Sequence, residues 1–369
     1  NTPLYIGITE LKLESNIGYA IGDPNSGGAK MWNLIQYQSE TSNSYSENNI
    51  YCLKAGVGFT NVDKRATYDI FYDMKTDKSE MVAQNQNTIL KELATKTLEL
   101  DDGTQISQYS AILAILEQCY FSKTSTEADR EALLKAAQIP TYTYNLTDDD
   151  IEAVQQAALW YFTNYGEEDI YNDYNQGTSE GRMRQQQAEI LYKYLIRTAI
   201  ENAPKYDNIE SQSGLPAQVN TTKIDYEESN GNYIIGPINI TENANNPSPY
   251  NIDFVVKNGE TETSDYKLLD SNKTEVPQGT TVEDLVGQNF YISVPNTVDI
   301  SEISVNITIN YNNTNLTLGI SSTNNKEQPI VLPEKESVSV PTELTITPHD
   351  ERIFDLALRK YITKINNNE

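Results

Sequence analysis

The sequence has few basic residues, little cysteine and almost no histidine. Of its 369 residues, 27 are Lys or Arg and 53 are Asp or Glu, which gives a formal net charge of −26. Proteins that bind nucleic acids or anionic membranes neutralise phosphates with Lys and Arg, so this charge argues against both classes. Apolar runs also stay well below the roughly 20 residues of a membrane-spanning helix. We expect neither a nucleic-acid partner nor membrane insertion.

The scarcity of His and Cys limits the possible chemistry. One His and two separated Cys do not make a zinc pattern, and the run Asp148-Asp149-Asp150 lacks the spacing of a calcium-binding loop. No phosphate-binding glycine motif is present. A Cys-dependent protease or transglutaminase usually has a His base beside its nucleophile, whereas His349 lies far along the chain in a spacer. We expect no metal and no cofactor, and a Cys-dependent acyl-transfer enzyme is the weakest alternative.

The two cysteines lie in different settings. Cys52 belongs to an extended-looking run, residues 49–56, whereas Cys119 belongs to a mostly apolar run, residues 111–120, that predicts a helix. We expect Cys119 to be a buried, unreactive thiol. A Cys52–Cys119 disulfide is the simple alternative, since secreted proteins often pair their cysteines.

A chain of this length is expected to form two or three domains. The N-terminal part predicts strands separated by Gly- and Asn-rich turns, at residues 4–13, 30–37, 49–57 and 65–72. From about residue 79 the pattern becomes helical, and a long helix over residues 178–203 is expected to stop at Pro204. Residues 207–219 are polar and contain Gly and Pro, which predicts a linker.

Beyond this linker, short strand-like runs alternate with turns rich in Asn, Gly and Pro. In residues 304–310, β-branched and polar residues alternate strictly, as expected for a half-buried strand. Further runs of this kind lie at residues 233–240, 250–257 and 289–294. Several such strands favour a β-sandwich.

A helix around Gln156 has a clear start signal. Thr147 is a plausible N-cap with Asp150 three residues later, the spacing of a capping box. One apolar stripe of this helix comprises Ile151, Val154, Ala158 and Phe162. At spacings of four and three, Gln156, Trp160 and Thr163 lie on a neighbouring face. The helix can therefore pack by one stripe and present Gln156 to a strand beside it. The simple alternative makes Gln156 a solvated helix residue and Trp160 a core residue.

Cys52 and the Gln156 helix together carry a family resemblance. An aromatic residue before a strand Cys, followed later by a Thr-Gln-x-Ala-Ile-Trp-like helix, resembles the thioester domains of Gram-positive surface adhesins. Gln156, Ala158 and Trp160 match that pattern, whereas Gln155 stands where Thr is usual and Leu159 where Ile or Val is usual. The resemblance covers roughly the first 210 residues.

The resemblance implies an internal thioester between Cys52 and Gln156, with Tyr51, Trp160 and Tyr161 shielding it from water. An amine, such as a Lys side chain of a host extracellular or plasma protein, would take the Gln156 acyl group and release Cys52. Because each molecule reacts once, this is reactive binding and no enzyme. The resemblance also implies a module at the cell surface, anchored to the cell wall through a C-terminal part absent from this chain. We expect the chain to be monomeric and to be a mature fragment of a longer protein.

The C-terminal residues 354–363 resemble the opening strand of immunoglobulin-like stalk domains. That resemblance makes Lys360 a possible isopeptide Lys, with a tail helix and a snorkelling Lys as the alternative. We predict an α+β thioester domain over residues 1–210, with a β-sandwich or barrel part and a helical part. An all-β immunoglobulin-like sandwich over residues 217–347 follows, and residues 348–369 are a linker and the start of a further stalk domain. A non-covalent surface protein, in which Cys52 and Gln156 never meet, is the main rival.

Overall fold

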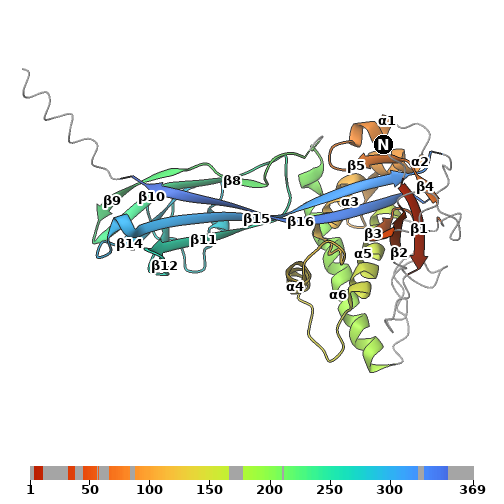
Figure 1. Ribbon diagram of the computed structural model, residues 1–369, viewed down its shortest axis with the longest axis horizontal. Helices are drawn as coiled ribbons and strands as arrows, with labels where there is room; N and C mark the ends of the chain where they lie inside the picture. Colours follow the sequence, from red (N-terminus) through yellow and green to blue (C-terminus); the bar gives the residue numbers. More distant parts are fainter. Residues whose placement is uncertain are drawn as a thin grey trace, which may run out of the picture. The chain divides into compact units, whose positions relative to one another are not determined.

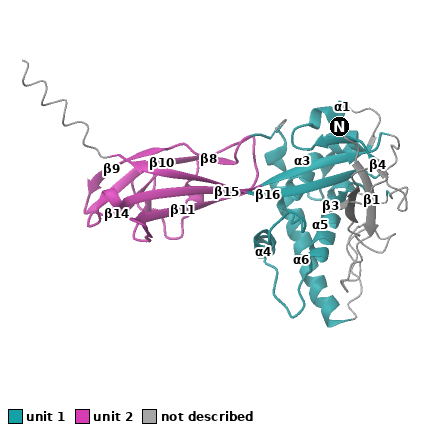
Figure 2. Cartoon of the chain, viewed as in Figure 1, with its two compact units in different colours: residues 1–213, 313–337 teal, residues 214–312, 338–369 magenta. Residues whose placement is uncertain are grey.

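The computed structural model describes residues 4–10, 32–37, 45–55, 57, 66–83, 88–165, 178–209, 212–322 and 328–347, and for residues 4–10, 32–37, 45–48, 66–67 and 88 it describes the backbone alone. The chain divides into two compact units (Figure 2). Unit 1 comprises residues 1–213 and 313–337, and unit 2 comprises residues 214–312 and 338–369. His349 and Lys360 lie outside the described residues, so the expectations for both stay predictions.

Unit 1 differs from the predicted 1–210 domain because two long strands extend into it. β15 spans Ile303–Ile320 and pairs with β5, Ile70–Asp73, from Thr317 opposite Asp73 to Ile320 opposite Ile70. β16 spans Ile330–Ile346 and pairs with β3, Tyr45–Cys52, at its end. Residues 313–337 therefore complete unit 1 although they follow most of unit 2 in sequence. Local sequence pattern does not reveal such a return, because the pairing partners lie hundreds of residues apart.

The strands before β5 form an antiparallel series in unit 1. β1 spans Leu4–Glu10, β2 spans Trp32–Tyr37 and β4 spans Ala66–Tyr68. β4 pairs with β1, β1 with β2, and β2 with β3. The described pairing of β2 with β3 ends where Trp32 lies opposite Ile50, two residues before Cys52.

The helical part of unit 1 follows β5 in sequence (Figure 1). It also contains a small antiparallel hairpin, β6–β7. Its elements are α1 (Lys78–Ala83), α2 (Thr88–Thr95), β6 (Thr97–Glu99), β7 (Gln105–Ser107), α3 (Gln108–Gln118), α4 (Glu127–Ala136), α5 (Asp148–Thr163), α6 (Ser179–Asn202) and a 3₁₀ turn (Ala203–Tyr206). α3 packs on both α5 and α6 and is buried almost all round, as expected for a helix that is apolar on every face. Unit 1 is thus a mixed α+β unit with one core.

The predicted helix limits are confirmed where capping residues set them. Thr147 accepts from the N–H of Asp150, and the Asp150 side chain accepts in return from the N–H of Thr147, so α5 starts with a capping box. Thr178 caps α6, which ends at Asn202, and Pro204 lies in the 3₁₀ turn that follows. Among the described residues, no helix is both long and apolar enough to span a membrane.

Unit 2 contains strands and two short 3₁₀ turns among its described residues. One set of paired strands follows the order β13-β14-β10-β9-β16, and β11 pairs with β12 and β15. The bounds are β8 (Ala217–Val219), β9 (Lys223–Ser229), β10 (Asn232–Glu242), β11 (Tyr250–Asn258), β12 (Thr261–Glu262), β13 (Lys267–Leu269) and β14 (Asn289–Pro295), with turns at Glu283–Leu285 and Ile300–Glu302. Both sets contribute to one apolar core. The alternation expected in residues 304–310 is confirmed, since every second side chain of that run is buried. The immunoglobulin-like class of this unit stays a prediction.

Candidate functional site

The fold brings Cys52 and Gln156 together across 104 positions of sequence. Cys52 is the last residue of β3, and its N–H donates to Oε1 of Gln156 at 2.7 Å. In return, Nε2 of Gln156 donates to the carbonyl oxygen of Cys52 at 2.9 Å. Cys52 is 3% exposed and Gln156 is 1% exposed. The alternative in which Gln156 is a solvated helix residue is therefore wrong. The expectation of the rival non-covalent protein that Cys52 and Gln156 never meet is wrong as well, whereas the absence of a thioester in that rival stays a prediction.

The strand pairing at the end of β3 explains why the Gln156 side chain can bind the backbone of Cys52. The N–H of Leu53 bonds to the carbonyl of Pro329, and β16 pairs Ile330 opposite Cys52. Hydrogen bonding alternates along an antiparallel ladder, so the backbone groups of Cys52 point away from β16. The Gln156 carboxamide offers one donor and one acceptor there, as a neighbouring strand would. The Cys52–Gln156 pair therefore satisfies a buried strand end.

Trp160 lies one helical turn after Gln156 and binds the same carbonyl oxygen, that of Cys52. Its Nε1–H donates to the carbonyl of Cys52 at 2.9 Å, so that oxygen accepts from two α5 side chains. The Trp160 and Tyr51 side chains are both buried, and the Tyr51 ring packs edge-on against Phe121 with centroids 5.8 Å apart. Both lie beside Cys52 in the core, and their shielding role stays a prediction.

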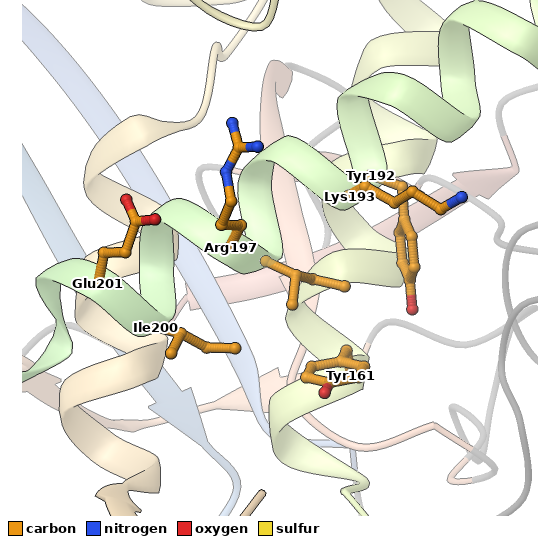
Figure 3. A pocket seen from close by; sticks show the side chains of 7 residues that line it. Tyr161, Tyr192, Lys193, Arg197, Ile200 and Glu201 are labelled. Atoms are coloured by element: carbon orange, nitrogen blue, oxygen red, sulfur yellow. The ribbon is translucent and has the colours of Figure 1, made fainter. Parts of the chain in front are cut away.

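Tyr161 occupies a different position from the other two aromatic residues. It is half-buried, and its ring packs edge-on against Phe162 and Tyr165. Its described neighbours also include α6, where it lines an apolar hollow of about 450 Å³ with Tyr192 and Ile200 (Figure 3). The structure therefore places Tyr161 at the α5–α6 surface, and its shielding role stays a prediction.

Two further carboxamides hold the residues that follow Cys52. Gln328 accepts from the N–H of Lys54 at 3.1 Å and donates to its carbonyl at 2.7 Å. Asn164 accepts from the N–H of Ala55 at 3.0 Å and donates to its carbonyl at 3.3 Å. Sequence reasoning missed both residues. Asn164 directly follows α5 and offered a weak signal, whereas Gln328 comes from the distant segment before β16 and offered none.

Gln155, the neighbour of Gln156, binds a second segment in the same two-point manner. Its Oε1 accepts from the N–H of Tyr120 at 2.6 Å, and its Nε2 donates to the Tyr120 carbonyl at 2.7 Å. The same Nε2 also donates to the phenol oxygen of Tyr51 at 2.8 Å. Gln155 is fully buried. Gln155, one of the two residues that depart from the resembled pattern, therefore binds the residue before Cys52.

Both cysteines are free, so the Cys52–Cys119 disulfide alternative is wrong for this structure. Cys119 caps the C-terminus of α3, and its Sγ donates to the carbonyl of Ile115 at 3.2 Å. Burial raises the pKa of each thiol to about 12. At Cys119 the nearby Lys335 lowers the pKa and Glu152 raises it, to smaller extents. Near neutral pH both thiols are therefore protonated, which for Cys119 agrees with the expected buried and unreactive role.

Glu152 is the titratable carboxyl nearest in sequence to the two glutamines on α5. Its Oε1 accepts from the N–H of Ser122 at 2.7 Å. Burial raises its pKa to about 7, and the charges of Asp149 and Asp148 add to that rise. Glu152 thus binds the loop after α3 through one hydrogen bond, and its carboxyl group titrates near neutral pH.

The arrangement at Cys52 has the parts of an acyl-transfer site. The Cys52 thiol belongs to the residue whose N–H binds the Gln156 carbonyl oxygen, and this contact keeps the Gln156 carboxamide beside the Cys52 backbone. The same N–H is a donor to the oxygen that gains negative charge if the carbonyl carbon is attacked. Among the described residues, no group of three or more His, Cys, Asp or Glu side chains is arranged to hold a metal ion.

The comparisons with known proteins give fold-level similarities alone. No protein-family model matches the chain, and no curated protein matches it. A solved structure described as the Bacillus anthracis TIE protein is similar over 94% of this chain and 49% of its own, with 9% identity and a TM-score of 0.35. The thioester domain of the Enterococcus faecium TIE86 protein is similar over 94% of this chain and 98% of its own, with 11% identity and a TM-score of 0.32. This chain spans about half the length of the first. At such TM-scores the similarities carry no functional argument, so the proposals below depend on the site.

Proposed function

We propose that Cys52 and Gln156 form an internal thioester that captures an amine. The two-point contact between the Gln156 carboxamide and the Cys52 backbone is the observation that carries this proposal. In the first step Sγ of Cys52 attacks Cδ of Gln156, the Cδ–Nε2 bond breaks, and the thiol proton leaves with the nitrogen as ammonia. The N–H of Cys52 stabilises the oxyanion on Oε1 during this step.

The second step transfers the acyl group to a partner. An amine nitrogen attacks Cδ, the Cδ–Sγ bond breaks, and Cys52 regains a proton from the amine. With a Lys amine the product is an isopeptide amide at Gln156. Each molecule reacts once, so the chain is a single-turnover binding protein in this proposal. By resemblance, the partner is a host extracellular or plasma protein, and the chain belongs to a cell-wall-anchored adhesin with an immunoglobulin-like stalk.

The burial of the pair supports storage of such a reactive bond. Thioesters hydrolyse if water reaches the acyl carbon, and both residues are almost fully buried. In this proposal Tyr51 and Trp160 help to keep water out. The same burial keeps the thiol protonated near neutral pH. Formation should therefore accelerate with rising pH, because the thiolate is the attacking species.

One observation favours a second candidate, a non-covalent surface protein in which Gln156 has an architectural role. The two-point pattern of Gln156 recurs at Gln155, Asn164 and Gln328, which bind the backbones of Tyr120, Ala55 and Lys54. Those three carboxamides satisfy backbone groups without a thiol on the bound residue. Gln156 differs from them because it binds a cysteine.

Intact mass spectrometry separates the two candidates. Under non-nucleophilic conditions, the proposed thioester lowers the mass of the wild-type chain by one ammonia. Cys52→Ala and Gln156→Ala should keep the full mass of their sequences. Methylamine should then add to Gln156 and expose Cys52 to a thiol reagent. A wild-type mass equal to the unmodified sequence, with Gln156 unhydrolysed in peptide maps, supports the architectural candidate.

The partner is tested with host extracellular and plasma proteins. Incubation should give a species that survives boiling in detergent, with a crosslink from Gln156 to a Lys of the partner. Cys52→Ala is the control and should give none. Adducts that persist in this variant, or that map away from Gln156, contradict the capture step even where the thioester forms.

A further inference from the structure

Gln155 is a buried carboxamide that connects three parts of unit 1. It binds α5 to the phenol of Tyr51 on β3 and to both backbone groups of Tyr120 after α3. We propose that Gln155 is a positioning residue for the Cys52–Gln156 reaction: it fixes the rotation of α5 against β3 so that the Gln156 carbonyl meets the Cys52 N–H. This inference rests on the proposed thioester.

The geometry gives two contacts at adjacent positions on both elements. Gln155 and Gln156 are consecutive on α5, and Tyr51 and Cys52 are consecutive on β3. Consecutive side chains of a helix point about 100° apart, so the two contacts constrain α5 from different directions. The contacts of Gln156 and Trp160 both end on Cys52, so they hold α5 at a single residue of β3. The added Gln155 contact restricts rotation of the helix about that residue.

The segment that Gln155 binds is itself held in place. The Lys335 ammonium donates to the carbonyls of Glu117 and Cys119 at 3.2 and 2.5 Å, just before Tyr120. Glu152 binds the N–H of Ser122 just after it. Gln155 is therefore attached to a fixed frame at the end of α3.

A rolled helix affects the reaction more than it affects the fold. Attack requires the Cys52 sulfur and the Gln156 carbon at near-contact distance in the correct direction, and a misplacement of about 1 Å can cost about 100-fold in rate. A helix with an apolar core stripe can tolerate such a shift with a modest loss of stability, because the stripe stays buried. Loss of Gln155 should therefore slow thioester formation beyond what its stability cost explains.

Gln187 offers a matched control on α6. It is also fully buried, and its carboxamide makes three hydrogen bonds to one loop: it accepts from the N–H of Leu146 at 2.9 Å and donates to Pro140 and Asn145 at 2.7 and 2.8 Å. Gln155→Met and Gln187→Met thus each remove a buried carboxamide with the same number of bonds. The two variants differ because Gln155 binds Tyr51 of β3, whereas Gln187 makes its three bonds to the loop before α5.

The test follows ammonia loss in time. The full chain is synthesised in vitro, kept unfolded in urea and diluted to start folding, and samples are acid-quenched for intact mass while tryptophan fluorescence reports folding. We expect Gln155→Met to fold and to lose ammonia about 10- to 100-fold more slowly than the wild type. Gln187→Met should react at the wild-type rate despite a similar loss of stability. Tyr51→Phe, which removes one of the three bonds, should fall between, and adding it to Gln155→Met should bring no further slowing.

Each outcome decides the inference. Equal rates for the wild type and Gln155→Met, or equal slowing in Gln187→Met, overturn it while the thioester stands. If Gln155→Met does not fold, Tyr51→Phe decides, and a wild-type rate in that variant overturns the inference. A wild-type chain that never loses ammonia overturns the proposed function itself, which is a separate result.

Discussion

The two cysteines of unit 1 share almost every bulk property and differ in what binds their backbone. Both are free, both are buried, and burial raises the pKa of both to about 12. A glutamine of α5 binds the backbone at or next to each cysteine. Gln156 binds the backbone of Cys52 itself, whereas Gln155 binds the backbone of Tyr120, the residue after Cys119.

In the proposed function, this difference of one position separates the reacting cysteine from the structural one. At Cys52 the thiol and the carbonyl carbon of Gln156 are tied to the same residue. At Cys119 the thiol donates to the Ile115 carbonyl, and the Lys335 ammonium binds the Cys119 carbonyl. The feature that distinguishes the two cysteines is therefore the carboxamide bound to the backbone of Cys52 itself, and the proposed function assigns the reaction to that cysteine.

The largest expected effect is the loss of the thioester in Cys52→Ala, compared with its retention in the matched variant Cys119→Ala. Cys52→Ala should abolish both the ammonia loss and the methylamine adduct, because the nucleophile is gone. Cys119→Ala should keep both, since its thiol lies outside the reactive pair. Intact mass of the two purified variants checks this. A folded Cys119→Ala variant that lacks the crosslink would contradict the assignment of different roles to the two cysteines.

A second effect concerns stability and needs no substitution. A thioester between Cys52 and Gln156 closes a loop of 104 positions, and the chain-entropy account of crosslinks predicts up to about 5 kcal/mol for such a loop. Methylamine opens the thioester and leaves the rest of the chain unchanged. Urea unfolding before and after treatment should show a lower midpoint after it, and Cys52→Ala should not respond to methylamine. Equal midpoints for the treated and untreated wild type would show that the bond serves reactivity alone.

The fold was predictable where its signals are local. The capping box at Thr147 and Asp150 and the stop near Pro204 follow from two or three neighbouring residues. Strict alternation likewise predicted the buried face of residues 304–310. The return of residues 313–337 into unit 1 was not predictable, because strand pairing across such distances leaves no periodic trace in the sequence.

The candidate site divides in the same way. Cys52, Gln156 and Trp160 were found because their residue types match a resembled pattern, and the structure brings the three into contact. The positions of Asn164 and Gln328 depend on which backbone groups stay unpaired at the end of β3. Only the assembled fold determines those groups.

A third prediction uses Glu152, whose charge acts on Cys119. The pKa of Glu152 rises from 4.5 to about 7 on folding, so the folded chain binds its proton more tightly. That contribution is fully present below pH 4.5 and is lost as pH rises through 7, amounting to about 3 kcal/mol. Glu152→Gln keeps an acceptor for Ser122 and removes the titration. Relative to the wild type, the variant should therefore gain stability between pH 4.5 and 8.

Urea unfolding of both proteins across this pH range checks the prediction. The other carboxylates titrate in both proteins, so their contributions cancel in the difference. Parallel stability profiles for Glu152→Gln and the wild type would contradict it. Cys52→Ala combined with Glu152→Gln should show the same pH difference, since burial alone accounts for the raised pKa of the Cys52 thiol.

The smallest expected effect distinguishes the state of the pair before and after reaction. Before reaction, the carbonyl of Cys52 accepts from both Gln156 and Trp160. Thioester formation expels Nε2 of Gln156 as ammonia, so of these two donors the Trp160 indole remains. Trp160→Phe should then leave a buried carbonyl unpaired in the thioester form, which costs about 1–3 kcal/mol, and less in a Cys52→Ala background that retains the carboxamide. Urea unfolding of Trp160→Phe in both backgrounds measures the difference, expected to be about 1 kcal/mol. Equal costs would mean that the indole acts through packing alone, and the Cys52 carbonyl then has another donor after reaction.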